Sequence, residues 1–246
     1  MVFLAMKRFF LIFLAFAAVS CVGQLDDDDP SGGGGSTTPA EGAGIVLDFT
    51  ATWCVNCPRM HQALEDAQAA RPGKIIPISV HFQDAMVCED GQALISHFGV
   101  EAYPSAVANM DATTLITATS KDLLLAKLDA TVSAKKPCTL EATKADGGVT
   151  VRVTAAEAGA YTLSVALLED GIVAAQTGAS ENYVHDNVFR GFLQENLLGD
   201  ALGQLEAGQA VERSFALPAD ASRKLRLVAF VCYDGVVNAT WAEDQN

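Results

Sequence analysis

Two cysteines placed between a short apolar run and a helical pattern limit the possible folds of this chain more than any other feature. Residues 45–49 have the length and the composition of a buried strand, and Cys54 and Cys57 follow it closely. From Arg59 onward apolar residues recur at helical spacing until a Pro-Gly pair ends the pattern. A strand that leads through a Cys-x-x-Cys pair into a helix predicts an α/β domain with Cys54 at the start of the helix.

The alternation of strand and helix patterns continues along the chain. Further strands are expected at residues 74–82, 105–110 and 114–119, and further helices at residues 89–98 and 123–132. Gly99 is expected to close the first of these two helices, and Pro104 directly precedes a strand. This order of elements predicts one α/β domain that ends near residue 136.

The residues around the two cysteines resemble a known motif. The run from Asp48 to Cys57 reads Asp-Phe-Thr-Ala-Thr-Trp-Cys-Val-Asn-Cys, which is similar at each position to the Asp-Phe-x-Ala-x-Trp-Cys-x-x-Cys run of thioredoxins. Tyr103-Pro104-Ser105 matches the place where that fold has a cis-proline followed by a small hydroxyl residue. The resemblance implies a thioredoxin-like domain over residues 45–136, without the extra strand and helix that begin thioredoxin itself.

The chemistry of the pair follows from its place in this pattern. A cysteine at a helix start sees free backbone N–H groups and the positive end of the helix dipole, which favour its thiolate. Cys54 is therefore expected to attack a disulfide, and Cys57 to resolve the mixed disulfide. The resemblance to thioredoxins implies that Asp48 is a buried acid that shuttles the proton of Cys57, with a pKa raised by burial. It also implies that Trp53 shields the pair and that a cis bond before Pro104 presents a backbone edge to the substrate.

The cysteine pair has other possible uses besides redox chemistry. Cys54, Cys57 and His61 could supply three zinc ligands, but no second Cys-x-x-Cys or nearby histidine pair completes the set, so no metal and no cofactor is expected. Haem attachment is excluded because Pro58 stands where that motif needs histidine. A structural disulfide on a scaffold that only binds is the remaining alternative, since fold does not determine function.

The second part of the chain, residues 137–246, has the pattern of a β domain. Apolar and polar residues alternate at residues 149–154, 161–167 and 211–217, which predicts half-buried strands. Residues 225–233 are nearly all apolar and are expected to run through the middle of a sheet. The spacing predicts an immunoglobulin-like β-sandwich, so the expected fold class is α/β plus all-β. His185 is expected to be a core or surface histidine.

Three cysteines remain outside the pair and the N-terminal segment. The N-terminal residues 1–21 have the features of an export leader, and an exported protein meets an oxidising compartment, so two of the three are expected to pair. We predict a bridge between Cys138, at the start of the second part, and Cys232, which faces the same side of its strand as Val228 and Phe230. Cys88 would then be free, either to exchange with Cys54 or as an inert buried thiol.

The N-terminal segment has the features of a lipoprotein leader. Two basic residues precede an apolar run of eleven residues, too short to span a bilayer, and the run ends at Ala18-Val19-Ser20-Cys21. These residues resemble a bacterial lipobox, which predicts a signal peptide at residues 1–20 and lipidation of Cys21. The acidic and Gly-Ser-rich residues 21–44 then form a flexible tether.

Several segments together resemble one family. The Cys-Val-Asn-Cys-Pro motif, residues 182–190 and residues 225–239 are similar to those of the twenty-eight-kilodalton outer-membrane lipoproteins of Bacteroidetes. The resemblance implies an outer-membrane lipoprotein that faces the periplasm or the cell surface, with a thioredoxin-like domain joined to a β-sandwich.

Two functions are consistent with these observations. The first is a membrane-anchored thiol–disulfide oxidoreductase whose partners are the thiols or disulfides of exported proteins. The second is a surface-exposed binding or adhesin-type lipoprotein in which the thioredoxin-like part is a scaffold. The net charge of −14 argues against nucleic acid as a partner, because phosphates would be repelled.

Overall fold

A computed structural model describes residues 42–132, 135–145, 147–218 and 224–244 of the chain. The predicted signal peptide, the lipidation site Cys21 and nearly all of the tether lie outside these residues. The structure therefore does not test the predictions made for these three segments.

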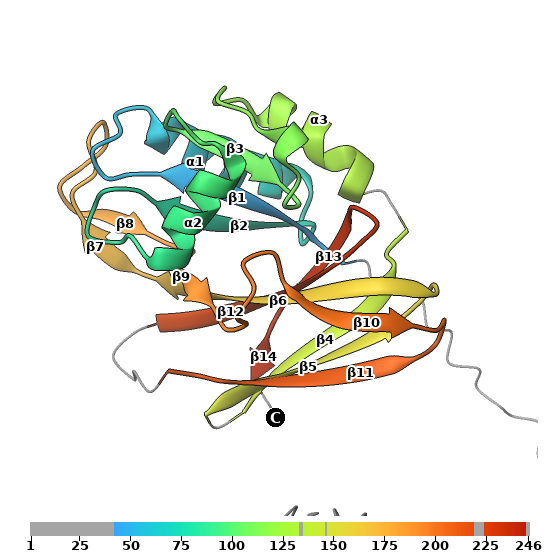
Figure 1. Cartoon of the computed structure of the whole chain (residues 1–246). Helices are drawn as coiled ribbons and strands as arrows, with labels where there is room; N and C mark the ends of the chain where they lie inside the picture. The colour runs from blue at the N-terminus through green and yellow to red at the C-terminus, as the bar shows by residue number, and fades with distance from the viewer. Residues whose placement is uncertain (1–41, 133–134, 146, 219–223, 245–246) are drawn as a thin grey trace, which may run out of the picture. The chain divides into compact units, whose positions relative to one another are not determined.

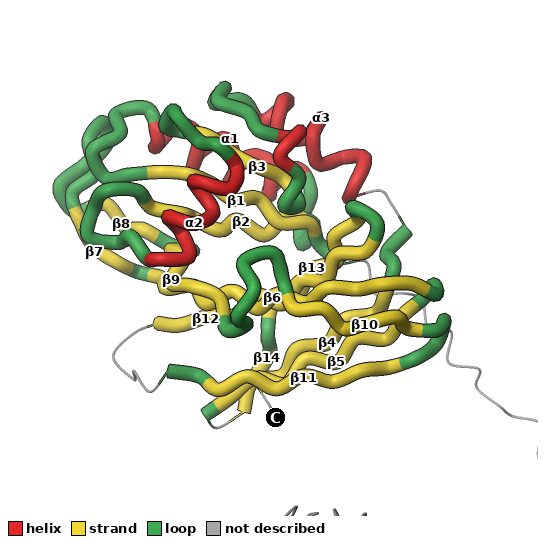
Figure 2. The backbone as a smooth tube through the Cα atoms, viewed as in Figure 1, coloured by secondary structure: helices red, strands yellow, loops and turns green. Residues whose placement is uncertain are grey.

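Within the described residues, the first part of the chain contains the helices and three strands. These are β1 (Gly44–Thr50), α1 (Cys57–Ala70), β2 (Ile75–His81), α2 (Glu89–Phe98), β3 (Ser105–Ala108), the 3₁₀ helix η1 (Ala112–Thr114) and α3 (Lys121–Val132). β1 pairs with β2 in parallel and with β3 in antiparallel orientation. All three α-helices lie around these strands, whereas the rest of the described chain is built from strands and loops (Figure 2).

The described residues of the second part form eleven strands. They are β4 (Cys138–Ala145), β5 (Gly148–Ala155), β6 (Gly159–Asp170), β7 (Ile172–Ala174), β8 (Tyr183–His185), β9 (Val188–Phe192), β10 (Asp200–Leu205), β11 (Ala210–Ala216), β12 (Lys224–Tyr233), β13 (Val236–Trp241) and β14 (Glu243–Asp244). β11, β5, β4 and β14 form one sheet, and β7 and β8 form a separate hairpin.

One sheet crosses the boundary expected at residues 136–137. Its order is β13-β12-β6-β9-β2-β1-β3, with β10 also paired to β6, so strands from both parts lie side by side (Figure 1). The junction is a parallel bridge between Ser79 on β2 and Val188 on β9. The expectation of a separate immunoglobulin-like sandwich is therefore corrected: the described strands of the second part are divided between this shared sheet, the four-stranded sheet and the β7–β8 hairpin.

The apolar residues of β12 show why the sheet can be shared. Leu227, Ala229 and Val231 pack into a core cluster with residues of β4 and β5. The alternate residues Val228 and Phe230 pack into another cluster with residues of β1, β2 and α2. Because both faces of β12 are covered, the nearly continuous apolar run has the composition of a central strand, as predicted.

The predicted disulfide between Cys138 and Cys232 is wrong, since both residues are free thiols. Cys138 is buried in the cluster between the two large sheets, whereas Cys232 packs against the cluster on the opposite face of β12. Cys232 does face the same side as Val228 and Phe230, but that side packs against the first part of the chain and not against β4. The prediction failed because it assigned the wrong face of β12 to the sandwich core.

Local sequence signals placed most of the first part correctly. α1 begins at Cys57, two residues earlier than its apolar pattern indicates, because Pro58 is well suited to a first helical turn. α2 ends at Gly99, which has the left-handed conformation that glycine adopts at low cost. The strand expected at residues 114–119 is wrong: the segment contains the end of η1 and then a single bridge between Ile116 and Ala106.

Candidate functional site

Cys54 and Cys57 form a disulfide between the end of β1 and the start of α1. The backbone N–H of Cys54 donates to the carbonyl of Ala51 over 3.1 Å, and the N–H of Cys57 donates to the carbonyl of Cys54 over 3.3 Å. These bonds fold the segment into a tight loop that places both sulfur atoms beside the first turn of the helix.

The disulfide is recessed between two exposed apolar side chains. Cys54 is 4% exposed and Cys57 is 3% exposed, whereas Trp53 is 48% and Val55 is 58% exposed. The indole N–H of Trp53 donates to the carbonyl of Phe82 over 3.2 Å and holds the ring beside the loop. A partner that reaches the disulfide would therefore meet an apolar rim.

An open hollow lies next to this rim. The Tyr103–Pro104 peptide bond is cis, as expected, and Tyr103 packs against the cluster that Ala51, Cys54 and Cys57 form. Asn56, Arg59, Tyr103, Pro104 and the stretch 117–120 line a hollow of about 530 Å³. The hollow is large enough for an extended peptide segment to approach the disulfide along the cis-proline loop.

Asp48 lies on β1 and lines a cavity together with Cys57. It is 2% exposed, and its Oδ1 atom is buried without a hydrogen-bond partner. Burial raises the pKa of Asp48 from 3.8 to about 7, because the charged carboxylate is disfavoured away from water. Near neutral pH the carboxyl group is therefore divided between its protonated and ionised forms, which suits a group that exchanges protons.

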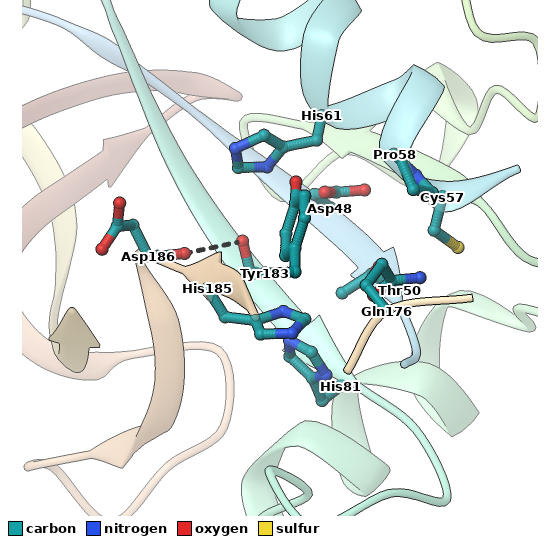
Figure 3. Close-up of a pocket in the computed structure, with 11 residues that line it drawn as sticks. Asp48, Thr50, Cys57, Pro58, His61, His81, Gln176, Tyr183, His185 and Asp186 are labelled. Atoms are coloured by element: carbon teal, nitrogen blue, oxygen red, sulfur yellow. Dashed lines mark hydrogen bonds between the residues drawn. The ribbon is translucent and has the colours of Figure 1, made fainter. Parts of the chain in front are cut away.

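Asp48 and Cys57 line the same small polar cavity, of about 20 Å³. Figure 3 shows that His61, His81, Tyr183 and His185 gather around it from α1, β2 and β8. The ring centroids of His81 and His185 are 5.4 Å apart, and the ring centroids of Tyr183 and His185 are 4.8 Å apart. Two strands of the first part, one helix and a hairpin of the second part thus build one polar site behind the disulfide.

His81 is held by Asp84 in a buried pair. Its Nδ1 atom lies 2.7 Å from Asp84 Oδ2, and the two side chains are 1% and 4% exposed. The carboxylate of Asp84 also accepts from the backbone N–H groups of Thr52 and Met86. Burial alone would raise the pKa of Asp84, but the His81 contact and these N–H groups outweigh it and hold the pKa below its usual value.

The loop between β7 and β8 covers the cysteine loop. The side-chain amide of Gln176 donates to the carbonyls of Ala51 and Cys54 over 3.2 and 3.0 Å, and Thr177 N–H donates to Thr52 over 2.8 Å. At Gly178 a Cβ atom would lie 2.4 Å from the carbonyl oxygen of Val55, so only glycine allows this approach. The second part of the chain therefore fixes the backbone of the Cys-x-x-Cys loop.

Sequence reasoning found part of this site and missed the rest. The structure brings together the predicted Cys54, Cys57, Asp48, Trp53 and Pro104 in one region. Gln176, Tyr183 and His185 were missed, and His185 lies in the polar cavity. The only sequence signal for Tyr183 and His185 was that residues 182–190 carry a family resemblance, and Gln176 had none. No spacing rule connects these residues to positions more than 100 residues away.

Cys88 has the environment of an unreactive thiol. It precedes α2, and its Sγ atom donates to the carbonyl of Phe189 over 3.5 Å. Burial raises the pKa of Cys88 above its usual value, which disfavours the reactive thiolate. Of the two expectations for Cys88, exchange with Cys54 or an inert buried thiol, this geometry favours the inert thiol.

No group of three or more potential metal ligands occurs within the described residues.

Comparisons with known proteins give a family and a fold. The model of the family described as outer membrane protein Omp28 matches residues 91–243. The structure of HBP35 of Porphyromonas gingivalis is similar with a TM-score of 0.65 and 19% identity, over 83% of this chain and 77% of that chain. A structure from Agrobacterium tumefaciens is similar with a TM-score of 0.58 and 14% identity, over 81% of this chain and 93% of that chain.

At these identities the structural likeness shows the fold alone. None of the curated proteins matches the sequence. Among the described residues, no helix is both long and apolar enough to cross a membrane. The match to the family model begins after Cys54 and Cys57, so it covers the α2 region and the β-rich part but not the cysteine pair.

Proposed function

The chain belongs to the outer membrane protein Omp28 family, and from this premise we propose that it is a membrane-anchored thiol–disulfide oxidoreductase acting on exported proteins. One observation carries the proposal: the Cys54–Cys57 disulfide lies beside the cis-proline hollow, and Cys57 lines the same small cavity as Asp48, whose buried Oδ1 atom has no hydrogen-bond partner. A disulfide that only stabilises the fold needs neither an open hollow beside it nor a buried acid next to it.

In the proposed reaction, the reduced Cys54–Cys57 pair reduces a target disulfide. The Cys54 thiolate attacks one sulfur of the target, a mixed disulfide forms, and the other target sulfur leaves as a thiolate. Asp48 takes the proton of the Cys57 thiol, and the Cys57 thiolate attacks Cys54 Sγ. The Cys54–Cys57 disulfide forms, the second target thiolate leaves, and a dithiol donor restores the reduced pair.

The recessed position of the pair also favours a second function. Cys54 is 4% exposed beneath the β7–β8 loop, and the family match does not include the cysteines. These two facts support a binding or adhesin-type surface protein in which the disulfide is structural. The two functions differ in whether the disulfide exchanges with another protein.

Insulin reduction separates the two functions. With dithiothreitol as the electron donor, the protein is expected to accelerate the precipitation of insulin chains, and Cys54→Ser is expected to return the rate to the uncatalysed background. Cys88→Ser is the matched control and should retain the activity, because Cys88 does not contact the pair. Equal rates for the wild type and Cys54→Ser would favour the binding function.

We also propose that Cys21 carries the lipid anchor. The apolar run that ends at Ala18-Val19-Ser20-Cys21 motivates this proposal, and the family is one of outer membrane proteins. After growth with a clickable fatty acid, the wild-type protein should be labelled and Cys21→Ala should not. Equal labelling of both proteins would exclude Cys21 as the acylated residue.

A further inference from the structure

Two residues that line the cavity beside Cys57 each carry one buried polar atom without a partner. Asp48 Oδ1 and His185 Nε2 both lack a hydrogen bond, and their residues are 2% and 5% exposed. Both residues line the same cavity, which Figure 3 shows between β1, α1 and β8. A buried polar atom without a partner is costly, so two of them around one cavity indicate a shared ligand.

The orientation of the His185 ring indicates what this ligand must supply. His185 hydrogen-bonds the backbone of Ala174, and since Nε2 has no partner, the bonded atom is Nδ1. A ring nitrogen that bonds a backbone carbonyl carries the proton, which leaves Nε2 as an acceptor. The ligand must therefore donate a hydrogen to His185.

The groups that face His185 keep it in this neutral form. Burial, the His81 ring and His61 lower its pKa, while Asp84 and the Ala174 contact act against them, and the result is about 4. Tyr183 packs against the ring as well, and Asp186 lines the cavity. At neutral pH, therefore, Nε2 can accept a hydrogen bond, and Asp48 can either donate or accept one.

The size and lining of the cavity fit one water molecule. Its volume of about 20 Å³ exceeds the roughly 10–15 Å³ that a single water needs. Thr50, Ser79 and Tyr183 add hydroxyl groups to the lining, and a buried water requires two to four polar partners. His61 lines the cavity too, and its side chain is 28% exposed beside Glu65.

We infer that Asp48 and His185 hold one internal water in this cavity, and that the proton Asp48 takes from Cys57 leaves through this water to His61. In this step Asp48 gives its proton to the water while the water gives one to His61, which releases it to solvent. His185 is a positioning residue, because it acts through the water and does not touch the reacting sulfur atoms. The proton route rests on the proposed redox function, whereas the water site does not.

The water site is tested on the oxidised full-length protein, without any enzymatic assay. The carboxyl carbon of Asp48 is titrated by NMR in the wild type, His185→Leu and His185→Gln. Leucine removes the acceptor and dries the cavity, so the ionisation constant of Asp48 should fall about tenfold. The amide oxygen of glutamine can accept from the water, so this variant should stay within about twofold of the wild type. An unchanged ionisation constant in His185→Leu would overturn the water site.

A wild-type crystal structure keeps the test decisive if His185→Leu does not fold. Density for a water within hydrogen-bond distance of both Asp48 Oδ1 and His185 Nε2 is expected, and its absence in well-ordered density would overturn the inference.

The proton route is tested by the pH dependence of insulin reduction, where His61→Leu should slow turnover about tenfold without moving the Asp48 titration. If insulin is not reduced by any variant but the His185→Leu shift is observed, the water site stands and the proposed function fails. If His61→Leu turns over at the wild-type rate, the route through His61 is excluded.

Discussion

Replacing Asp48 with asparagine is expected to raise the free energy of unfolding at pH 8 by up to about 4 kcal/mol. The pKa of Asp48 is raised from 3.8 to about 7 in the folded protein, and this difference corresponds to about 4 kcal/mol. The folded state binds the proton more tightly than the unfolded state. The stability linked to Asp48 is therefore fully present below pH 3.8 and is lost as the pH rises through about 7. Asparagine carries no buried charge at pH 8 and avoids this loss.

Urea denaturation at several pH values between 4 and 8 measures the effect. The gain from Asp48→Asn should grow with pH and level off above about pH 7, while insulin reduction by the same variant should fall. Asp66→Asn, on the exposed side of α1, is the matched control and should change the free energy of unfolding by less than about 0.5 kcal/mol. The His185 titration is common to both proteins, so the comparison is made on the difference between them. A gain from Asp48→Asn that is the same at pH 5 and pH 8 would show that Asp48 has an ordinary pKa.

Replacing Asp84 with alanine is expected to lower the free energy of unfolding, by about as much as Asp48→Asn raises it. The variant leaves His81 and the N–H groups of Thr52 and Met86 without their acceptor. Removal of one member of a buried, hydrogen-bonded pair costs about 3–5 kcal/mol, because the remaining polar groups stay desolvated. The free energy of unfolding at pH 7 should fall by this amount.

The control for this prediction is a second acidic residue with an exposed partner. Asp129 pairs with Arg71 over 3.2 Å, but both side chains are more than 40% exposed. Asp129→Ala should therefore cost less than about 1 kcal/mol in the same urea titration. Similar losses for Asp84→Ala and Asp129→Ala would indicate that the His81–Asp84 pair is not buried in solution.

Features that depend on neighbouring residues were predictable from the sequence. The strand at residues 45–49, the helix that follows the cysteines and the Gly99 helix end are specified by local periodicity and capping. The motif that contains Asp48, Cys54 and Cys57 is equally local, and the structure brings its residues together. These features require no knowledge of how distant strands pair.

Features that depend on distant pairing were not predictable. The bridge between Ser79 and Val188 joins the two parts into one sheet, and no pattern in either strand identifies its partner. The same uncertainty led to the wrong disulfide, because alternation shows which residues share a face of β12 but not which core that face meets. His185 was expected to be an ordinary core or surface histidine. Long-range contacts, which are the β2–β9 pairing and the bonds of Gln176 and Thr177, place the β7–β8 hairpin beside this site.

The reduction potential of the Cys54–Cys57 pair tests the central claim most directly. The full-length protein is equilibrated in dithiothreitol and glutathione buffers, acid-quenched and alkylated, and the fraction of reduced pair is counted by mass spectrometry. A Cys54→Ser, Cys57→Ser protein identifies signal from the other cysteines. We predict a potential between about −270 and −120 mV, the range of disulfides that exchange with other proteins. A value below about −300 mV, typical of structural disulfides, would contradict the proposed oxidoreductase function.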